Sequence, residues 1–286
     1  MIRVAGAPIS WGVCEVPCWG HQMNPERVLD EMATAGLAAT EFGPDGFLPQ
    51  DPGARSALLA GHGLAAVGGF VPVVLHDPGR DPLPEVRRAL AGFGSARTLV
   101  LAAATGSDGY DTRPELSERE WDALLGNLDR IAAHARTEGI TATLHPHIGT
   151  MVEGPDEVER VLTGSSVPLC LDTGHLLAGG NDPVALARRA ADRIAHVHLK
   201  DVDAALAARV RAGDLTYTAA VRTGLYQPLG RGDVDISAIT TALGAAGYTG
   251  WYVLEQDTVL DAEPAPGEGP LADVVASLAH LRKVTS

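Results

Sequence analysis

The fold of this chain is decided by two segments, Leu171-Asp-Thr-Gly-His175 and His196-Val-His-Leu-Lys-Asp201. Each is a short apolar run that ends in residue types able to bind a metal. The second segment alternates, so His196 and His198 project from the same face of a strand. Two other runs end in the same way: 141–144 before His145 and His147, and 251–254 before Glu255 and Asp257. Four strands that end in His, Asp or Glu predict one divalent-metal site at the carboxyl-terminal rim of a parallel barrel.

Strand-like and helix-like segments alternate along the whole chain. The expected strands are 4–9, 38–42, 65–71, 98–103, 141–145, 168–171, 194–199 and 252–254. Helix start signals lie between them: Asn24-Pro25, Ser117 with Glu120 three residues on, Asn181-Asp182-Pro183, and the segment that opens the last helix, 271–283. Eight β–α alternations without a repeated hairpin signal predict an α/β fold, a single (β/α)8 TIM barrel.

The chain length of 286 residues fits one barrel domain spanning residues 1–286, since such barrels need about 250 residues. The pattern breaks once, at about 202–226, where a polar and alanine-rich stretch delays the next helix to 236–246. We expect this stretch to be an insertion on a βα loop. There it is either a substrate-covering lid or an ordinary surface loop.

Composition excludes several classes of function. The formal net charge is −14, which argues against nucleic acid as a partner, because binding phosphates needs concentrated Lys and Arg. No apolar run approaches the roughly 20 residues of a membrane span, and the first residues do not have the order of a signal peptide. The three cysteines are an odd number, which favours a reducing compartment over a disulfide framework. We therefore expect a cytoplasmic protein with no membrane partner.

The residues at the strand ends are candidates for a metal centre. Asp172, His198 and Glu255 end the sixth, seventh and eighth expected strands. Either His145 or His147 adds a ligand from the fifth strand. A mixed set of histidine and carboxylate ligands suits Mn²⁺, Co²⁺, Zn²⁺ or Fe²⁺ better than Ca²⁺. We expect one divalent ion of this group, and the spacing does not distinguish among its members.

Several passages of the sequence resemble one family of barrel enzymes. They are Ala7-Pro-Ile-Ser-Trp11, Gly36-Leu-Ala-Ala-Thr-Glu41-Phe-Gly-Pro-Asp-Gly-Phe-Leu-Pro49, His145-Pro-His-Ile-Gly-Thr150, and the two segments 172–175 and 196–201. The first resembles an Asn-Pro-Ile-Gly-Trp opening, and the second resembles a signature of the second strand. The similarity runs nearly end to end. The chain thus resembles the xylose isomerase-like barrel superfamily and, within it, the inosose dehydratases.

This resemblance implies a metal ligand set of His145, Asp172, His198 and Glu255. Most isomerases and epimerases of the superfamily have a glutamate where His145 stands, and two glutamates then exchange a proton between the faces of the substrate. Here only Glu255 remains of that pair, so a two-carboxylate epimerisation is less natural unless His145 serves as the second base. Elimination of water instead needs one base beside a carbonyl and one acid for the leaving hydroxide, with a metal to polarise the carbonyl.

The same rim supplies candidates for these roles. The expected catalytic residues are Glu255, His175, Lys200 and His147, and the expected substrate-binding residues are Trp11, Glu41, His147, His175 and Lys200. Lys200 is either a donor to the oxyanion or a salt-bridge partner of Asp201. Glu15 and His21, in the first βα loop, are possible rim contacts. The turn 230–235 could offer backbone N–H groups to a phosphate, but its two aspartates disfavour this.

These observations predict a metal-dependent lyase that acts on an inosose, with a small polyol or keto-sugar as its substrate. Aldose–ketose isomerisation or epimerisation at the same site is the main alternative. An abasic-site nuclease, by analogy with endonuclease IV, and a sugar-binding protein without catalysis are more remote alternatives. The resemblance also implies a homo-oligomer.

Overall fold

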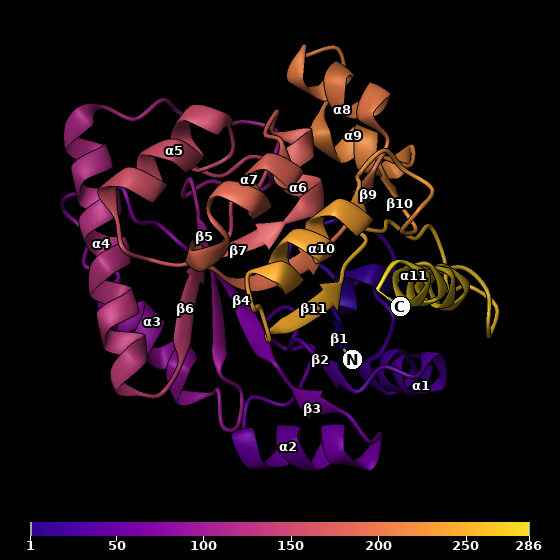
Figure 1. Ribbon diagram of the computed structural model, residues 1–286. Helices are drawn as coiled ribbons and strands as arrows, with labels where there is room; N and C mark the ends of the chain where they lie inside the picture. The colour runs from indigo at the N-terminus through magenta and orange to yellow at the C-terminus, as the bar shows by residue number, and fades with distance from the viewer. Residues whose placement is uncertain (1, 286) are drawn as a thin grey trace.

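A parallel barrel forms the centre of the protein in the computed structural model, which describes residues 2–285 (Figure 1). Its strand segments follow the order β3-β2-β1-β11-β8-β7-β6-β5-β4, and every pair in this sheet is parallel. The segments are β1 (Arg3–Gly6), β2 (Ala39–Thr40), β3 (Ala65–Ala66), β4 (Gly68–Val73), β5 (Thr98–Ala103), β6 (Thr141–Leu144), β7 (Leu169–Asp172), β8 (Ile194–Leu199) and β11 (Trp251–Leu254).

The segments β3 and β4 are two parts of one barrel strand, separated by Val67. The Val67 N–H donates to the carbonyl of Thr40 (3.0 Å) on the β2 side. The Val67 carbonyl accepts from the N–H groups of Arg97 (3.0 Å) and Thr98 (3.2 Å) on the β5 side. The two ends of the strand order therefore meet, and the segments occupy the eight positions of a closed barrel. The predicted (β/α)8 barrel is confirmed.

The first strand is shorter than the sequence predicted. We expected it to cover 4–9, but β1 ends at Gly6, and a 3₁₀ helix, η1 (Pro8–Trp11), begins after Ala7. Pro8 has no backbone N–H to donate to a strand ladder, so the extended pairing stops before it. The chain then leaves the turn through Gly12, whose φ is 75°.

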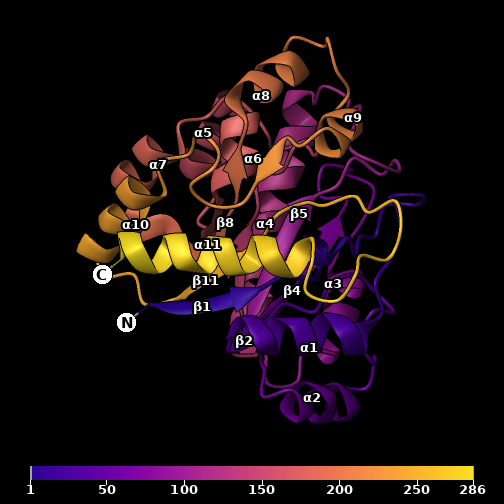
Figure 2. The ribbon, with the colours of Figure 1, turned by 90° about the vertical axis from the view of Figure 1, so that its right-hand side faces the viewer.

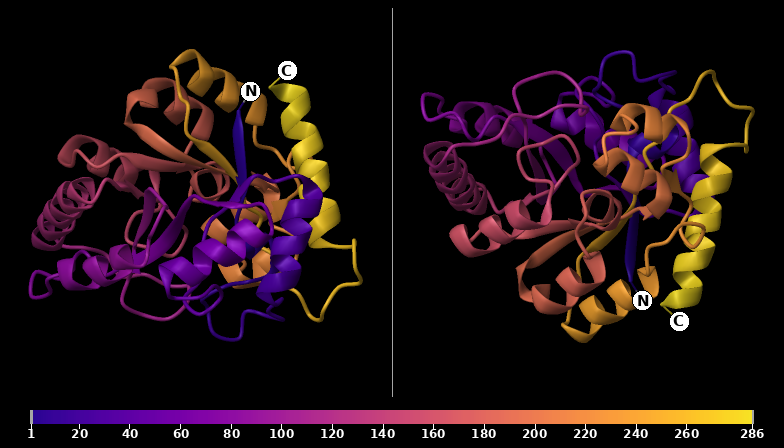
Figure 3. Two further views of the ribbon diagram at one scale, coloured as in Figure 1. Left: turned by 90° about the horizontal axis from the view of Figure 1, so that it is seen from below. Right: turned by 90° about the horizontal axis from the view of Figure 1, so that it is seen from above.

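Helices surround the strands on the outside of the barrel (Figure 3). They are α1 (Pro25–Ala35), α2 (Pro52–Gly61), α3 (Leu83–Ala91), α4 (Glu118–Thr137), α5 (Pro155–Gly164), α7 (Pro183–Arg189), α10 (Ile236–Ala245) and α11 (Pro270–Val284), with α6 (Thr173–Ala178) and η2 (Ala191–Arg193) as short additions. The sequence signals mark real helix starts: the Asn24 side chain accepts from the N–H of Arg27, and Glu120 accepts from that of Ser117. The last helix, α11, runs close to β1 and α1 (Figure 2). No helix within residues 2–285 combines the length and apolarity that crossing a bilayer requires.

The stretch after β8 forms a small subdomain on the carboxyl-terminal side of the barrel (Figure 1). It consists of β9 (Asp201–Val202), α8 (Ala204–Arg211), α9 (Tyr217–Arg222) and β10 (Tyr226–Gln227), with β9 and β10 antiparallel. Arg222 donates from Nη2 to the Trp19 carbonyl (2.6 Å) in the first βα loop. The Thr218 N–H donates to Asp111 Oδ1 (2.9 Å) in the loop after β5. The insertion is thus bonded to two other rim loops.

The base of this insertion is held by one fully buried carboxylate, Asp201. Its Oδ2 accepts from the N–H groups of Gly230 (2.7 Å) and Gly232 (3.0 Å). Its Oδ1 accepts from those of Val202 (2.9 Å) and Val234 (3.0 Å). Asp201 therefore occupies the backbone donors of the turn 230–235, in agreement with our view that this turn is not a phosphate site.

Replacing Asp201 by Asn should destabilise the protein. The substitution keeps the side-chain volume but turns one acceptor oxygen into a donor that faces backbone N–H groups. A buried donor left without its acceptor costs about 1–3 kcal/mol, so the free energy of unfolding should fall by about that amount. Denaturant unfolding measures it, with the exposed Asp214→Asn as control. Equal stabilities of the two variants would contradict the role of Asp201.

Candidate active site

Four strands deliver one histidine or carboxylate each to the same point of the rim. Asp172, the last residue of β7, pairs in register with His198 of β8, so their side chains are neighbours. Glu255 follows β11 directly, and its N–H donates to the Leu199 carbonyl (3.1 Å) beyond His198. His145 follows β6 directly. The barrel register therefore brings together four residues that are far apart in the sequence.

Their donor atoms lie within 4.8 Å of one another, and we call these four residues the metal-site group: His145, Asp172, His198 and Glu255. His145 Nε2 is 3.2 Å from Asp172 Oδ2. His198 Nδ1 is 3.6 Å from the same oxygen and 2.5 Å from Glu255 Oε2. This geometry brings His145 into the group from strand β6, which is one of the two alternatives that the sequence left open.

The metal-site group has the features of a cation site. Within residues 2–285, His145 Nδ1, His198 Nδ1 and Glu255 Oε2 are buried without a hydrogen-bond partner. The close approach of His198 to Glu255 lacks hydrogen-bond geometry. Buried polar atoms without partners are costly, and a divalent ion in the metal-site group would satisfy His198 Nδ1 and Glu255 Oε2. The residues present therefore fit a divalent metal.

Cys170 lies close to the same histidines, and it forms a possible alternative ligand group with His145 and His198. Its side chain is fully buried. Burial raises the pKa of this thiol to about 11, although the positive charge of His198 partly offsets the effect. Because the thiolate is the form that binds metals, the carboxylates Asp172 and Glu255 are the better partners for the two histidines.

Asp172 is fixed by the helix that follows it. Its Oδ1 accepts from the N–H groups of Gly174 and His175, both at 2.8 Å, and so caps α6. This capping leaves Oδ2 free to face His145 and His198 of the metal-site group. Burial alone would raise the pKa of Asp172, but the positive charge of Lys200 and the hydrogen bond from His145 hold it well below its usual range. The carboxylate is therefore ionised and oriented.

Glu41 orients His198 of β8 through the ring nitrogen that does not face the metal-site group. Its Oε1 accepts from His196 Nε2 (2.7 Å) and from His198 Nε2 (3.1 Å). With Nε2 of His198 engaged in this way, Nδ1 is the ring nitrogen that faces the metal-site group. Burial alone would raise the pKa of Glu41, but the charge of His198 and both hydrogen bonds lower it. A carboxylate behind a ligating histidine is a common arrangement in metal sites.

A second group of similar residues, His147, His175 and Asp257, lies at the same rim with its donor atoms within 4.8 Å. Lys200 Nζ donates to Asp257 Oδ1 (2.6 Å) and lies 2.9 Å from His175 Nε2. Lys200 therefore pairs with Asp257 instead of its sequence neighbour Asp201. Burial raises the pKa of Asp257 and the charge of Lys200 partly offsets this. Burial would lower the pKa of Lys200, but the surrounding carboxylates raise it well above its usual value.

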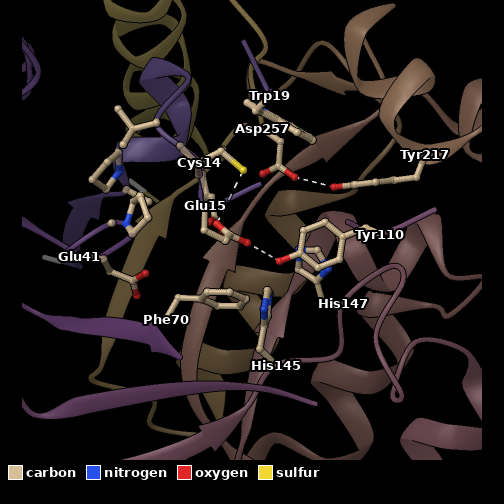
Figure 4. Close-up of a pocket in the computed structure, with 17 residues that line it drawn as sticks. Cys14, Glu15, Trp19, Glu41, Phe70, Tyr110, His145, His147, Tyr217 and Asp257 are labelled. Atoms are coloured by element: carbon tan, nitrogen blue, oxygen red, sulfur yellow. Dashed lines mark hydrogen bonds between the residues drawn. The ribbon is translucent and has the colours of Figure 1, made fainter. Parts of the chain in front are cut away.

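A cavity opens beside these groups and is shown in Figure 4. Its lining residues that can do chemistry are Cys14, Glu15, Glu41, Tyr110, His145, His147, Tyr217, Glu255 and Asp257. The Tyr110 hydroxyl donates to Glu15, and the Tyr217 hydroxyl donates to Asp257 Oδ2 (2.7 Å). Of the expected catalytic residues, His147 and Glu255 border this cavity. His175 and Lys200 lie behind its wall, in contact with Asp257.

The position of Trp11 differs from the expectation that it contacts substrate. Trp11 is fully buried, and its indole N–H donates to Glu31 Oε2 (2.8 Å), away from the cavity. The tryptophan in the cavity wall is Trp19. His21 pairs with Glu263 near the surface, whereas Glu15 lies at the cavity as expected.

Sequence reasoning missed the aromatic residues of the cavity. Phe70, Tyr110 and Tyr217 come from β4, the loop after β5 and the insertion, respectively. The Tyr110 ring centroid lies 4.4 Å from that of His147. Tyr110 lies in a loop, which carries no periodic signal. Phe70 lies in an expected strand, but the strand pattern does not show which of its residues faces the cavity. A hint was available for Tyr217 alone, since it lies in the expected insertion.

The fold and the site agree with comparisons to known proteins. The model of a family described as the xylose isomerase-like TIM barrel matches residues 29–284. The chain belongs to this family. It is 34% identical to an inosose dehydratase of Geobacillus kaustophilus, over 89% of this chain and 87% of the relative. It is also 36% identical to the rhizopine catabolism protein MocC of Rhizobium meliloti, over 90% of this chain and 82% of the relative.

A solved structure of the IolI protein with a bound zinc atom has the same fold. The TM-score is 0.71, and the superposition covers 100% of this chain and 98% of that protein. The sequence identity is 15%, so this likeness concerns the fold alone. Together with the family match, it confirms the architecture that the strand pattern predicted.

Replacing Glu41 by Gln should weaken metal binding without unfolding the protein. The neutral amide of glutamine is a weaker acceptor than the Glu41 carboxylate for the two histidine N–H groups. The orientation of the His198 ring should therefore be less fixed. Losing such a supporting contact typically costs about 10–100-fold in metal affinity. Competition with a chelating dye measures the change. The control is Glu26→Gln, which removes a carboxylate that contacts His62 outside the site. An unchanged affinity in Glu41→Gln would contradict the orienting role.

Proposed function

We propose that this chain is a divalent-metal-dependent dehydratase that removes water from an inosose, 2-keto-myo-inositol. The observation that carries the proposal is the metal-site group, whose unpartnered atoms lie beside a cavity at the carboxyl-terminal rim of the barrel. The similarity to an inosose dehydratase over 89% of this chain supports the substrate class. Mn²⁺, Co²⁺, Zn²⁺ and Fe²⁺ all suit the two histidines and two carboxylates.

His145, Asp172, His198 and Glu255 would hold the metal. A bound divalent ion would polarise the substrate carbonyl and stabilise the negative charge that develops on its oxygen. The Glu255 carboxylate also borders the cavity, where it can orient a substrate hydroxyl. Burial alone would raise the pKa of Glu255, but His198 and Lys200 lower it. Glu255 is also one of the four residues that would hold the metal, so another side chain at the cavity is needed to move the proton.

His147 is the better candidate for moving the proton. Its Nδ1 donates to the Ile148 carbonyl (2.6 Å), so the lone pair of the neutral ring is on Nε2. Burial and the nearby positive charges of His145 and Lys200 lower the pKa of His147 well below its usual value. The neutral imidazole can take the proton beside the carbonyl and return it to the leaving hydroxide. One residue then serves as base and as acid.

The other expected site residues lie around Asp257 or line the cavity. Lys200 holds the Asp257 carboxylate from behind, and the Tyr217 hydroxyl holds it from the insertion. His175 lies next to Lys200 on the same side. Glu41 and Tyr110 are the side chains placed to contact the hydroxyls of a polyol ring, because both line the cavity. The ring of Tyr110 also packs on His147 and so restricts its orientation.

The reaction should depend on bound metal and should remove one water. Treatment with a chelator should abolish turnover of 2-keto-myo-inositol, and added Mn²⁺ or Co²⁺ should restore it. Mass spectrometry should find a product lighter than the substrate by one water. A product of unchanged mass with solvent deuterium incorporated would instead establish isomerisation or epimerisation. No change in any inosose with metal present would contradict the proposed function.

Replacing His147 by Gln should separate proton transfer from metal binding. Loss of a general acid–base residue lowers kcat by about 100–10,000-fold, while the metal-site group is left intact. Steady-state kinetics and metal titration measure the two effects, with His134→Gln on α4 as control. A parallel loss of metal affinity would mean that His147, and not His145, is the ligand from this segment. Unchanged kcat would contradict its role as the base.

A further inference from the structure

Two groups of metal-binding residue types lie side by side at the rim of the barrel, and they differ in how their polar atoms are satisfied. The metal-site group leaves three buried atoms without partners within residues 2–285. In the second group, His147, His175 and Asp257, hydrogen bonds reach every residue. The difference is due mainly to one side chain, Lys200.

Lys200 provides a positive charge inside the second group. Its ammonium donates to Asp257 Oδ1 at 2.6 Å and approaches His175 Nε2 to 2.9 Å. An ammonium only donates, so His175 accepts at Nε2. The Nδ1 of the same ring lies 3.1 Å from the Tyr226 hydroxyl and 3.5 Å from the Ile148 N–H. Tyr217 donates to the other Asp257 oxygen (2.7 Å). These are the lone pairs that a divalent ion would require.

The position of this ammonium is fixed by the backbone around it. The Thr173 hydroxyl donates to the Lys200 carbonyl (2.7 Å) and accepts from the Lys200 N–H (2.8 Å). The Lys200 stem passes directly over Gly174, where an added Cβ would meet Lys200 Cγ at 2.6 Å. The glycine of the segment 171–175 is therefore needed to admit this side chain.

Lysine is also a rare choice in this chain. Of the 22 lysine and arginine residues, two are lysines, Lys200 and Lys283. The side chain of Lys200 is 1% exposed, so it is one of the most deeply buried charges in the described chain. A compact ammonium acts as a point charge, which the planar guanidinium of arginine cannot reproduce.

We infer that the Lys200 ammonium fills a second cation site formed by His147, His175 and Asp257. The wild-type chain therefore binds one divalent ion, in the metal-site group, and a chain without this charge binds two. A divalent ion in the second group would lie within a few ångströms of the ammonium and be repelled by it. Removing the ammonium leaves the buried Asp257 carboxylate without compensation, and a metal ion can replace the lost charge. This inference concerns metal binding in the absence of substrate, so it stands apart from the proposed reaction.

The test is the number of metal equivalents bound by Lys200→Met, which keeps an unbranched side chain but removes the charge. Metal-free protein is titrated with Zn²⁺, desalted, and its zinc content is measured. We expect one equivalent for the wild type, two for Lys200→Met and one for Lys200→Met combined with Asp257→Asn. The exposed Lys283→Met is the matched control and should bind one equivalent. One equivalent in Lys200→Met would overturn the inference.

The wild type provides a second test that does not depend on the folding of Lys200→Met. Wild-type protein should retain one tight equivalent, and Asp257→Asn should retain the same one. Two tight equivalents in the wild type, with one lost in Asp257→Asn, would mean that Lys200 does not occupy the second site. If Lys200→Met folds only when zinc is added and then holds two equivalents, the inference is supported.

Discussion

The carboxyl-terminal rim of this barrel concentrates buried charge, and that charge must be balanced. Asp172, Glu255 and Asp257 all approach the ammonium of Lys200, at 3.6, 3.6 and 2.6 Å. Burying an ionised carboxylate without compensation is costly, so these side chains form a stable arrangement only as a set. The single ammonium is already committed most closely to Asp257. In the metal-site group, His198 Nδ1 and Glu255 Oε2 are buried without a hydrogen-bond partner, and this is the reason why we assign a cation there.

The barrel geometry makes this set possible. Parallel strands present their carboxyl ends at one rim, so residues from β6, β7, β8 and β11 meet although they span more than a hundred positions of the chain. The supporting contacts come from other elements. Glu41 after β2 orients His198, and α6 is capped by Asp172. The insertion 201–227 then places Tyr217 and Tyr226 over the second group. These supporting contacts restrict the orientations of the residues at the rim.

The strand pattern predicted the barrel and placed Asp172, His198 and Glu255 at strand ends on one rim, whereas the choice of His145 over His147 came from the family resemblance. A strand that ends in His or Asp can be recognised by alternation alone, as the expected common face of His196 and His198 showed. The partner of Lys200 could not be predicted, since Asp201 is adjacent in sequence while Asp257 approaches through the barrel register. Trp19 and Tyr110 lie in loops, where local sequence does not specify direction. The position of Glu41 was predicted, but its contact with two histidines required the closed barrel.

The most direct measurement of the central claim is a crystal structure of the Mn²⁺- or Zn²⁺-loaded protein with the metal located by its anomalous scattering. The account predicts an ion at coordination distance, about 2.0–2.2 Å, from His145, Asp172, His198 and Glu255. An ion bound through the Cys170 sulfur, or one located away from the carboxyl-terminal rim, would contradict it.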